Sequence, residues 1–305
     1  MLGMVLAAGL GTRLRPLTHA LPKPAVPVGN RPLCLFAIEH LVRHGASAVR
    51  LNAHYLADRL VAEVESEAPS GVDLAFSVET TLLGTGGGLR KALAGMTDEL
   101  VVVMNGDILF APDLASAIAS HRRSGALATL VVRHHPDPHA LGAVEVDGEG
   151  RVVRIAGAPG EPRTSTTPYV FTGVHVLSPA VLALLPEEGC VVRQAYQPML
   201  SRGLPIAAHV DDSPWLDLGT LRTYLDANLG LADGRLTASG IVPTASGLVH
   251  PSAEVRGRLS RCVVGRGAVV PKGVELEDVV VWHDAVVRDS LRSAVVTRDG
   301  VVPIP

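Results

Sequence analysis

Two positively charged side chains follow a glycine-rich turn near the beginning of the chain. Gly9 and Gly11 come directly after an apolar run, and Arg13 and Lys23 follow them. Successive backbone N–H groups in such a turn bind phosphate oxygens, and a guanidinium adds a planar fork of donors. Lys23 lies between two prolines that restrict the backbone, so its ammonium group projects from a stiff segment. These residues predict a phosphate-binding site.

Other glycine-rich motifs fit this segment less well. A dinucleotide-binding fingerprint has a third glycine and runs into a helix, whereas arginine and proline residues follow Gly11. A P-loop ends in Gly-Lys-Ser or Gly-Lys-Thr, and the sequence contains neither. The remaining alternative is a tight turn with no ligand.

Two aspartates in distant segments are candidates for holding a divalent cation. Asp107 follows the apolar run Leu100–Met104, and Asp217 lies within Trp215–Thr220. Parallel sheets bind ligands beyond the carboxyl ends of their strands, where Asp107 is expected. Two carboxylates are enough for Mg²⁺, which keeps water and substrate phosphates as its other ligands. Taken singly, Asp107 is more typical of a turn and Asp217 of an exposed acid.

The elements that position these side chains alternate between strands and helices. This alternation predicts an α/β fold with a mostly parallel sheet that is covered on both faces. We expect strands at Met4–Ala8, Ala48–Ala53, Val72–Val78, Leu100–Met104, Ala128–Arg133, Ala143–Val146, Val152–Ile155, Val170–Leu177 and Ile206–Val210. We expect helices at Pro32–His44, Leu56–Ser66, Gly87–Leu93, Leu114–Ser124, Pro179–Leu185, Val192–Arg202 and Thr220–Leu231.

The last part of the chain has a different pattern. A large apolar residue recurs every six positions, at Val264, Val270, Leu276 and Trp282. This period predicts a short parallel β-helix of about three coils rather than an irregular valine-rich tail. The stretch Ala238–Gly247 is rich in small residues. We therefore predict a catalytic domain over residues 1–235, a linker over 236–248 and a β-helix over 249–305.

Composition excludes several classes of function. The chain has 305 residues, a formal net charge of −3, 47% hydrophobic residues and 3% aromatic residues. It therefore lacks the basic footprint and the aromatic platform that nucleic-acid binding uses. No apolar run approaches the ~18 residues of a membrane span. Three widely spaced cysteines predict neither disulfides nor a zinc site. We expect a cytoplasmic protein with no nucleic-acid or membrane partner.

The run from Leu6 to Pro32 (LAAGLGTRLRPLTHALPKPAVPVGNRP) resembles the signature of the sugar-1-phosphate nucleotidylyltransferases. The resemblance continues at Glu79–Gly87, Asn105–Asp107, Phe171–Gly173 and Trp215–Thr220, so it covers nearly all of the chain before the small-residue stretch. The six-residue period is similar to the left-handed β-helix that several members carry. The resemblance implies a Rossmann-like, mostly parallel mixed sheet, followed here by that β-helix.

The resemblance also implies a role for each matching position. Arg13, Lys23 and Asp107 match catalytic residues, and Asp107 and Asp217 match two aspartates that hold Mg²⁺. The positions that match the nucleotide site are Leu6, Ala8, Gly9, Gly11, Thr12, Arg13, Glu79, Gly84 and Thr85. The positions expected at the sugar phosphate are Gly142, Arg163, Thr172 and Gly173.

One departure from the family pattern concerns the sugar phosphate. Many members carry Glu-Lys-Pro after the strand on the sugar side, and the lysine binds the sugar phosphate. The segment from Arg154 to Arg163 contains no lysine. We expect Arg154 or Arg163 to take its place.

The reaction implied by the resemblance needs no general base. The phosphate of a sugar 1-phosphate is largely ionised at neutral pH. It attacks the α-phosphorus of a nucleoside triphosphate, and pyrophosphate leaves. The expected activity resembles that of mannose-1-phosphate guanylyltransferases, with GTP or UTP as the nucleotide and Mg²⁺ as the cofactor.

Several alternatives stay open at this point. One is a uridylyl- or thymidylyltransferase for a muramate- or glucose-type 1-phosphate. Another is a non-catalytic relative that binds a nucleotide sugar and regulates a partner. Acyl transfer by the tail is disfavoured because the tail is short. Exposed coil ends and apolar faces predict a homo-oligomer that assembles through the β-helix.

Overall fold

The computed structural model describes residues 1–156 and 165–304. Arg163, one of the residues expected at the sugar phosphate, lies outside these ranges.

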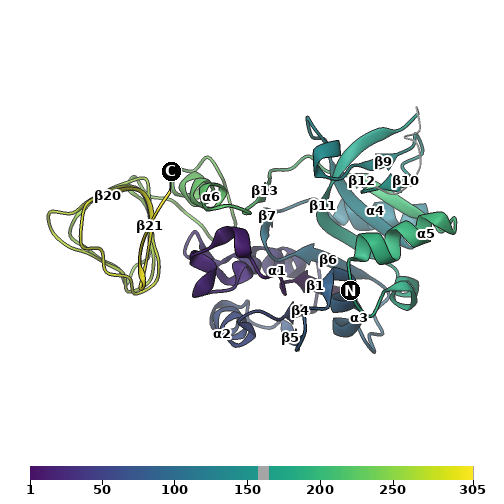
Figure 1. Ribbon diagram of the computed structural model, residues 1–305, viewed down its shortest axis with the longest axis horizontal. Coiled ribbons are helices and arrows are strands. Elements are labelled where there is room, and N and C mark those ends of the chain that lie inside the picture. Colours follow the sequence, from purple (N-terminus) through teal and green to yellow (C-terminus); the bar gives the residue numbers. More distant parts are fainter. Residues whose placement is uncertain (157–164, 305) are drawn as a thin grey trace.

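A nine-stranded mixed sheet forms the centre of the larger part of the molecule (Figure 1). Its main strands follow the order β12 (Ile206–Val210), β8 (Ala128–Arg133), β11 (Thr167–Leu177), β6 (Val101–Asn105), β1 (Leu2–Leu6), β4 (Ala48–Ala53) and β5 (Asp73–Val78). Among these, only β11 runs against both of its neighbours, and the other strand pairs are parallel. The predicted mostly parallel α/β sheet is therefore confirmed.

Helices cover both faces of this sheet because its strands are apolar on both sides. In β1, Val5 faces one buried cluster, whereas Leu2 and Met4 face the other. The first cluster is completed by α1 (Leu33–Arg43), α2 (Ala57–Glu67) and α4 (Leu114–Ser124). The second is completed by α3 (Gly84–Ala92), two short helical segments (Pro179–Leu184 and Val192–Tyr196) and α5 (Gln197–Ser201).

Several of the expected elements differ in their bounds or type. Strand β1 ends at Leu6 rather than Ala8, which leaves the glycine-rich turn free of the ladder. The expected helix at Val192–Arg202 begins as a π-helix over Val192–Tyr196. Helix α3 begins at Gly84 rather than Gly87. Its glycines pack against a neighbouring loop, since a Cβ on Gly87 would lie 2.3 Å from the carbonyl oxygen of Glu187.

Small antiparallel pairs lie beside or extend the main strands. Strand β7 (Ile108–Phe110) pairs with β13 (Trp215–Asp217), and neither strand is expected from the sequence. Strands β2 (Pro27–Val28) and β3 (Arg31–Pro32) form a hairpin just after Lys23. Strands β9 (Val144–Val146) and β10 (Val152–Ile155) form another, and β9 extends the central sheet at the first half of β11.

The C-terminal stack is a separate set of strands at one end of the molecule (Figure 1). It comprises β14 (Gly247–Val249), β15 (Glu254–Val255), β16 (Arg258–Ser260), β17 (Cys262–Val264), β18 (Val269–Val270), β19 (Glu275–Val281), β20 (Leu291–Thr297) and β21 (Gly300–Pro303). Helix α6 (Leu221–Ala232) lies between this stack and the central sheet.

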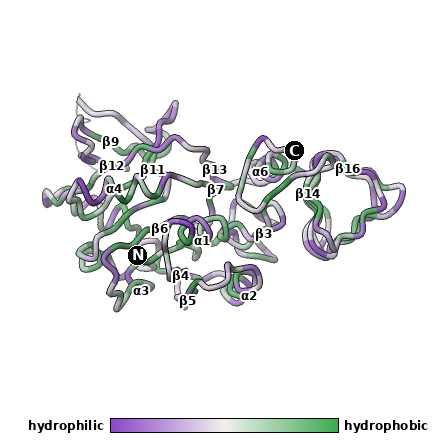
Figure 2. Tube along the Cα trace, turned by 180° about the vertical axis from the view of Figure 1, so that it is seen from behind, coloured by the Kyte–Doolittle hydropathy of each residue, from purple (hydrophilic) through white to green (hydrophobic). Residues whose placement is uncertain are grey.

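Within the C-terminal stack the chain pairs with itself after each circuit. Val249 pairs with Val264, and Leu259 pairs with Leu276, both in parallel. Three stacked corner residues, Arg261, Asp278 and Ser293, have positive φ angles. Each of these circuits is shorter than three six-residue steps, and hydrophobic stretches alternate with hydrophilic ones around it (Figure 2).

None of the helices in the described ranges is both long and apolar enough to span a bilayer. Cys34, Cys190 and Cys262 are free thiols in the structure.

Candidate active site

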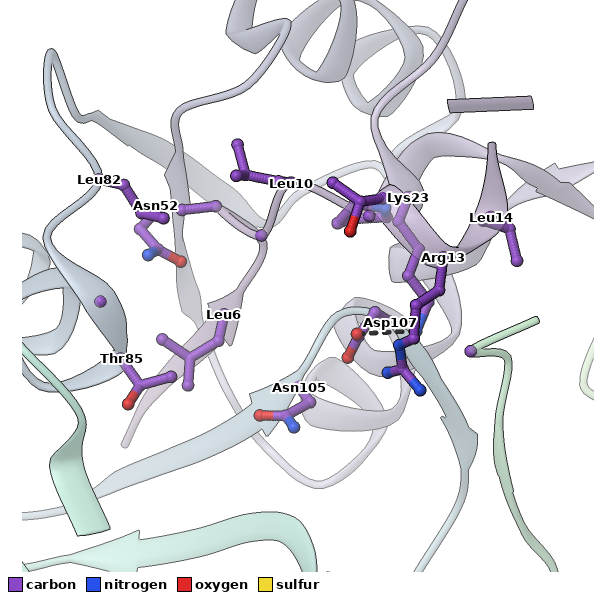
Figure 3. Close-up of a pocket in the computed structure, with 17 residues that line it drawn as sticks. Leu6, Leu10, Arg13, Leu14, Lys23, Asn52, Leu82, Thr85, Asn105 and Asp107 are labelled. Atoms are coloured by element: carbon purple, nitrogen blue, oxygen red, sulfur yellow. Dashed lines mark hydrogen bonds and ion pairs between the residues drawn. The ribbon is translucent and has the colours of Figure 1, made fainter. Parts of the chain in front are cut away.

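A cavity of about 460 Å³ opens at the carboxyl ends of the central strands. Leu6, at the end of β1, pairs with Asn52 of β4 on one side and with Asn105 of β6 on the other. All three side chains line the cavity (Figure 3). The charged residues Arg13, Lys23 and Asp107 lie at one end of it, and Asn52, Leu82 and Thr85 lie at the other. The cavity therefore has a charged half and an uncharged half.

Lys23 is the centre of the charged half. Its Nζ donates to Asp107 Oδ2 at 2.9 Å and to Asp217 Oδ1 at 3.1 Å. The lysine is only 5% exposed, whereas both aspartate side chains are 37% exposed. A buried ammonium is stable when it is paired in this way. The two carboxylates that are far apart in the sequence therefore converge on one cation.

The glycine-rich turn is packed directly against Lys23. Gly11 has a φ of +60°, and a Cβ on it would lie 2.8 Å from the Cβ of Lys23. The hydroxyl of Thr18 donates to the carbonyl oxygen of Gly11 at 2.9 Å. A larger residue at position 11 would be strained and would displace the lysine. Glycine is therefore required here for close approach as well as for backbone conformation.

The short ladder between β7 and β13 places the two aspartates side by side. Asp217 is opposite Ile108 in this ladder, so it lies next to Asp107. Asp107 in turn follows β6 after a tight connection at Gly106, where a Cβ would lie 2.8 Å from Val5 Cγ1. The pairing of two three-residue strands thus sets the separation of the carboxylates.

Arg13 is the second cation of this half. Its guanidinium Nη2 lies 3.8 Å from Asp217 Oδ2, and its side chain is 70% exposed. A Cβ on Gly219 would lie 2.8 Å from Arg13 Nη1, so the guanidinium lies flat against this glycine. Because Arg13 is exposed and only loosely paired, its donors are accessible to an anionic ligand.

A buried hydrogen-bond network forms the floor of the uncharged half. Asn52 accepts from the backbone N–H of Ala7 at 2.8 Å and donates to Glu79 Oε1 at 2.7 Å. Glu79 Oε2 accepts from the N–H of Leu83 at 2.9 Å. Glu79 is only 2% exposed and is absent from the cavity lining. Its carboxylate therefore fixes the loop before α3 rather than facing a ligand.

Two exposed leucines lie at the mouth of the uncharged half. Leu10 and Leu82 are among the most exposed large apolar side chains of the described residues, and both line the cavity. Thr85 Oγ1 accepts from the N–H of Val191 at 2.9 Å, which joins α3 to the neighbouring helical segment. This half therefore offers apolar surface and backbone groups, which suit a flat heterocycle rather than a phosphate.

Most of the residues expected at the nucleotide line this cavity. They are Leu6, Ala8, Gly9, Gly11, Thr12, Arg13, Gly84 and Thr85, and the expected catalytic residues Lys23 and Asp107 line it as well. Asp217 is joined to them through Lys23 and Arg13. The structure thus brings the expected nucleotide and catalytic residues together around one cavity. Glu79 is buried beneath the cavity lining.

The described residues that were expected at the sugar phosphate are Gly142, Thr172 and Gly173, and they do not line this cavity. Thr172 is buried, and its hydroxyl donates to the carbonyl oxygen of Val131 at 2.8 Å, at an irregularity in β11. Gly173, with a φ of +84°, lies against Asn105, since a Cβ there would be 2.4 Å from Asn105 Nδ2. Gly142 has a φ of +83° and faces Ala156. None of the three lines the cavity, and Arg154 is paired with Glu145 at 2.7 Å.

Sequence reasoning assigned no role to two asparagines of the cavity. Asn52 and Asn105 lie at the carboxyl ends of β4 and β6, next to the end of β1. The sequence signal for each was an asparagine at the end of an apolar strand. The carboxyl ends of parallel strands meet at the ligand-binding edge of the sheet, so a polar side chain there is a candidate site residue.

The pair of carboxylates fits a divalent cation. Lys23 takes one oxygen of each aspartate, both aspartate side chains are 37% exposed, and Asp217 Oδ2 lies 3.8 Å from Arg13 Nη2. Oxygen ligands of this kind suit Mg²⁺, which needs few of them from the protein. Within residues 1–156 and 165–304, no cluster of three or more His, Cys, Asp or Glu side chains could serve as an all-protein metal site. A cation at this position would therefore be coordinated partly by the two aspartates and partly by water and substrate oxygens.

A comparison with protein families matches residues 2–234 to the model described as "Nucleotidyl transferase". The chain belongs to this family. Its match covers the central sheet, the cavity and α6.

Two curated relatives of this nucleotidyl transferase are similar over most of its length. A mannose-1-phosphate guanylyltransferase from Mycobacterium tuberculosis is 32% identical over 287 residues, which cover 92% of this chain and 79% of the relative. A UTP–glucose-1-phosphate uridylyltransferase from Synechocystis is 31% identical over 246 residues. These residues cover 76% of this chain and 63% of that relative.

A solved structure shares the fold. HddC from Yersinia pseudotuberculosis, crystallised in complex with GMP-PN, superposes with a TM-score of 0.62 at 24% identity. The superposition covers 74% of this chain and 97% of that one.

Proposed function

We propose that this nucleotidyl transferase joins a nucleoside triphosphate to a sugar 1-phosphate, which yields a nucleoside diphosphate sugar and pyrophosphate. The observation that carries the proposal is the convergence of Asp107 and Asp217 on Lys23, with Arg13 beside them. Family membership and the names of both relatives support the reaction class.

The charged half of the cavity suits the transfer of a nucleotidyl group. Two anionic reactants repel each other, so the enzyme must hold them together and neutralise their charge. Lys23 places a buried ammonium at the point where the two carboxylates meet, and exposed Arg13 offers donors to phosphate oxygens. The N–H groups of the turn at Gly9 and Gly11 add further donors. The sugar phosphate is its own nucleophile, so these residues orient and stabilise rather than transfer protons.

We assign the cofactor as Mg²⁺ held by Asp107 and Asp217. When bound, the ion neutralises phosphate charge and polarises the phosphoryl group under attack. The closeness of the two carboxylates, whose side chains are partly exposed, supports this assignment. We assign Arg13, Lys23 and Asp107 as the catalytic residues.

The uncharged half is proposed to hold the nucleotide base. The nucleotide-binding residues are Leu6, Ala8, Gly9, Gly11, Thr12, Arg13, Gly84 and Thr85, with Glu79 holding the loop in place. For the sugar phosphate we retain Gly142, Thr172, Gly173 and Arg163. Gly173 supports this placement because its contact with Asn105 links β11 to the cavity.

Our preferred substrates are GTP and a mannose-type 1-phosphate. The similarity to the mannose-1-phosphate guanylyltransferase extends over 92% of the chain and therefore includes at least part of the C-terminal stack. The similarity to the glucose-1-phosphate uridylyltransferase covers 76%. UTP with a glucose- or muramate-type 1-phosphate is the second candidate.

Pyrophosphate release tests the reaction and the substrates together. The purified protein is incubated with Mg²⁺ and each pair from GTP, UTP, dTTP and ATP against mannose, glucose, heptose and muramate 1-phosphates. We expect release that depends on both substrates, with the highest kcat/KM for GTP and mannose 1-phosphate. Binding of nucleotide sugar without release from any pair would instead indicate a non-catalytic regulatory protein.

We also propose that the C-terminal stack is a left-handed β-helix and that the chain divides at residues 1–235, 236–248 and 249–305. Parallel pairing of each circuit with the next, as between Val249 and Val264 or Leu259 and Leu276, supports a coil of three short strands. A homo-oligomer assembled through the stack is proposed because Val249, Val286 and Val301 are exposed on it. Light scattering with size exclusion should give a mass above one chain, and a monomer would contradict this assembly.

A further inference from the structure

The segment that carries Lys23 continues into a hairpin. This hairpin packs against α6 and the C-terminal stack rather than against the central sheet. Strands β2 and β3 are joined by Gly29 and Asn30, whose φ angles are +56° and +69°. Two consecutive positive φ angles define the tight turn that is favoured in two-residue hairpins. Val26 and Val28 are completely buried in a cluster with α6 and the C-terminal stack. The backbone that positions Lys23 therefore depends on these two elements.

Helix α6 makes two hydrogen bonds to this hairpin. The hydroxyl of Tyr224 donates to the carbonyl oxygen of Pro27 at 2.6 Å. The side-chain oxygen of Asn228 accepts from the N–H of Gly29 at 2.9 Å. Tyr224 and Asn228 are both fully buried. Since buried polar groups are costly to leave unpaired, each contact strongly favours one position of the hairpin.

The C-terminal stack makes hydrogen bonds to the same hairpin and to the same helix. Trp282 Nε1 donates to the hydroxyl of Tyr224 at 2.9 Å, so this hydroxyl accepts from the stack and donates to the hairpin. Asn30 Nδ2 donates to the carbonyl oxygen of Val264 at 2.9 Å. A continuous chain of hydrogen bonds therefore runs from Trp282 through Tyr224 to Pro27, which lies shortly after Lys23 in the chain.

Tyr224 is also close in sequence to Asp217, one of the two carboxylates that are paired with Lys23. Helix α6 begins at Leu221, after an N-cap at Thr220, and Asp217 lies just before this cap. One helix thus anchors both the strand that ends at Asp217 and the hairpin that follows Lys23. The separation between the lysine and this carboxylate is set through α6.

We propose that Tyr224 and Trp282 are positioning residues for nucleotidyl transfer, which makes the C-terminal stack a structural part of the active site. This inference rests on the function proposed above. Loss of the Tyr224 hydroxyl leaves both the Pro27 carbonyl and the Trp282 N–H without their partner. The hairpin then shifts, and Lys23 leaves its position between the two aspartates.

The expected effect falls on turnover rather than on nucleotide binding. Lys23 lines the charged half of the cavity and is paired with Asp217, whereas Asn52 and the loop before α3 form the uncharged half on other elements. Misplacement of a catalytic group by about 1 Å costs roughly 100-fold in rate. For Tyr224→Phe we therefore expect kcat to fall about 10- to 100-fold, with the KM of the nucleotide nearly unchanged.

Tyr196→Phe is the matched control. Tyr196 is also fully buried, and its hydroxyl is bonded to His175 in the other buried cluster, away from the hairpin. Both variants lose one buried hydroxyl, so similar losses of thermal stability are expected. Only Tyr224→Phe should lower kcat. Equal effects of the two variants on kcat would overturn the proposal.

Double variants separate positioning from general destabilisation. Trp282→Phe should lower kcat less than Tyr224→Phe, because the bond from Tyr224 to Pro27 remains, and combining both should add nothing to Tyr224→Phe alone. In a Lys23→Ala background, Tyr224→Phe should have no further effect on kcat. The same fold-loss in both backgrounds would refute a role through Lys23. An inactive wild-type protein would instead count against the proposed function itself.

Discussion

Lys23 and Asp217 are distant in the chain, yet Lys23 Nζ lies 3.1 Å from Asp217 Oδ1. The same ammonium group donates to Asp107 at 2.9 Å. Two carboxylates that share one ammonium group repel each other, and the lysine offsets that repulsion. Lys23 therefore holds the two carboxylates together, and in the function that we propose it also presents positive charge to phosphate.

Replacing Lys23 with alanine should abolish most turnover. Removal of one preorganised charge of this kind typically costs 10²- to 10³-fold in rate, or about 3–4 kcal/mol. We expect a kcat reduced by about that factor in a pyrophosphate-release assay, with a folded protein by circular dichroism. Lys272→Ala, at an exposed lysine of the C-terminal stack, is the control. Near wild-type turnover for Lys23→Ala would remove this residue from the mechanism.

The aspartates should control the requirement for Mg²⁺. Asp107→Asn and Asp217→Asn each keep the size of the side chain but remove one negative charge from the exposed oxygens. We expect each variant to need about tenfold more Mg²⁺ for half-maximal activity, because outer and inner ligands typically change metal affinity 10- to 100-fold. A Mg²⁺ titration of initial rates measures this. Asp289→Asn, at an exposed position, should match the wild type, and an unaltered titration for both site variants would exclude the assigned metal ligands.

Much of the fold was predictable because hydrophobic periodicity is strong in the central sheet. The bounds of β4, α4 and β8 agree with the sequence pattern, since each is long and apolar on the expected side. The convergence of the charged site was predictable as well. Glycine, arginine and lysine near the first strand and aspartate after β6 all belong to the carboxyl edge of a parallel sheet.

Other features depend on contacts that local patterns do not contain. The pairing of β7 with β13 involves only three residues of each strand, which is too short for a periodic signal. The circuits of the C-terminal stack are shorter than three full six-residue steps, and the left-handed backbone at Arg261 and Asp278 is not marked by glycine. The role of Glu79 was also hidden, since its partners are a side chain of β4 and a backbone N–H.

Gly11→Ala should reduce both stability and activity, and Gly125→Ala should reduce stability alone. The two glycines have nearly the same φ, +60° and +61°. A left-handed conformation costs alanine about 1–2 kcal/mol at either position. A Cβ at Gly125 meets open space, whereas one at Gly11 presses on Lys23 at 2.8 Å. Chemical denaturation and kcat together test this, and equal activity of the two variants would contradict the contact with Lys23.

Glu79→Gln should weaken nucleotide binding more than turnover. Both carboxylate oxygens of Glu79 accept hydrogen bonds, from Asn52 Nδ2 and from the N–H of Leu83. A glutamine would turn its own amide N–H toward one of these donors, which leaves a buried donor unpaired. We expect about a tenfold rise in the KM of the nucleotide, consistent with a loss of roughly 1–3 kcal/mol. Glu65→Gln on the exposed side of α2 is the control, and a fall in kcat at constant KM would refute the assignment of Glu79 to the base side.

His175 should make the protein less stable in acid. Complete burial lowers the pKa of this histidine from 6.5 to about 3. Between these values the unfolded chain binds a proton that the folded protein excludes, so the free energy of unfolding falls as pH falls. The slope from one such group is about 1.4 kcal/mol per pH unit. His175→Asn keeps a polar partner for Tyr196 and removes the titration. Urea unfolding between pH 7 and about pH 4.5 should show a shallower slope for the variant than for the wild type. Parallel slopes would mean that His175 already takes up a proton in the folded protein.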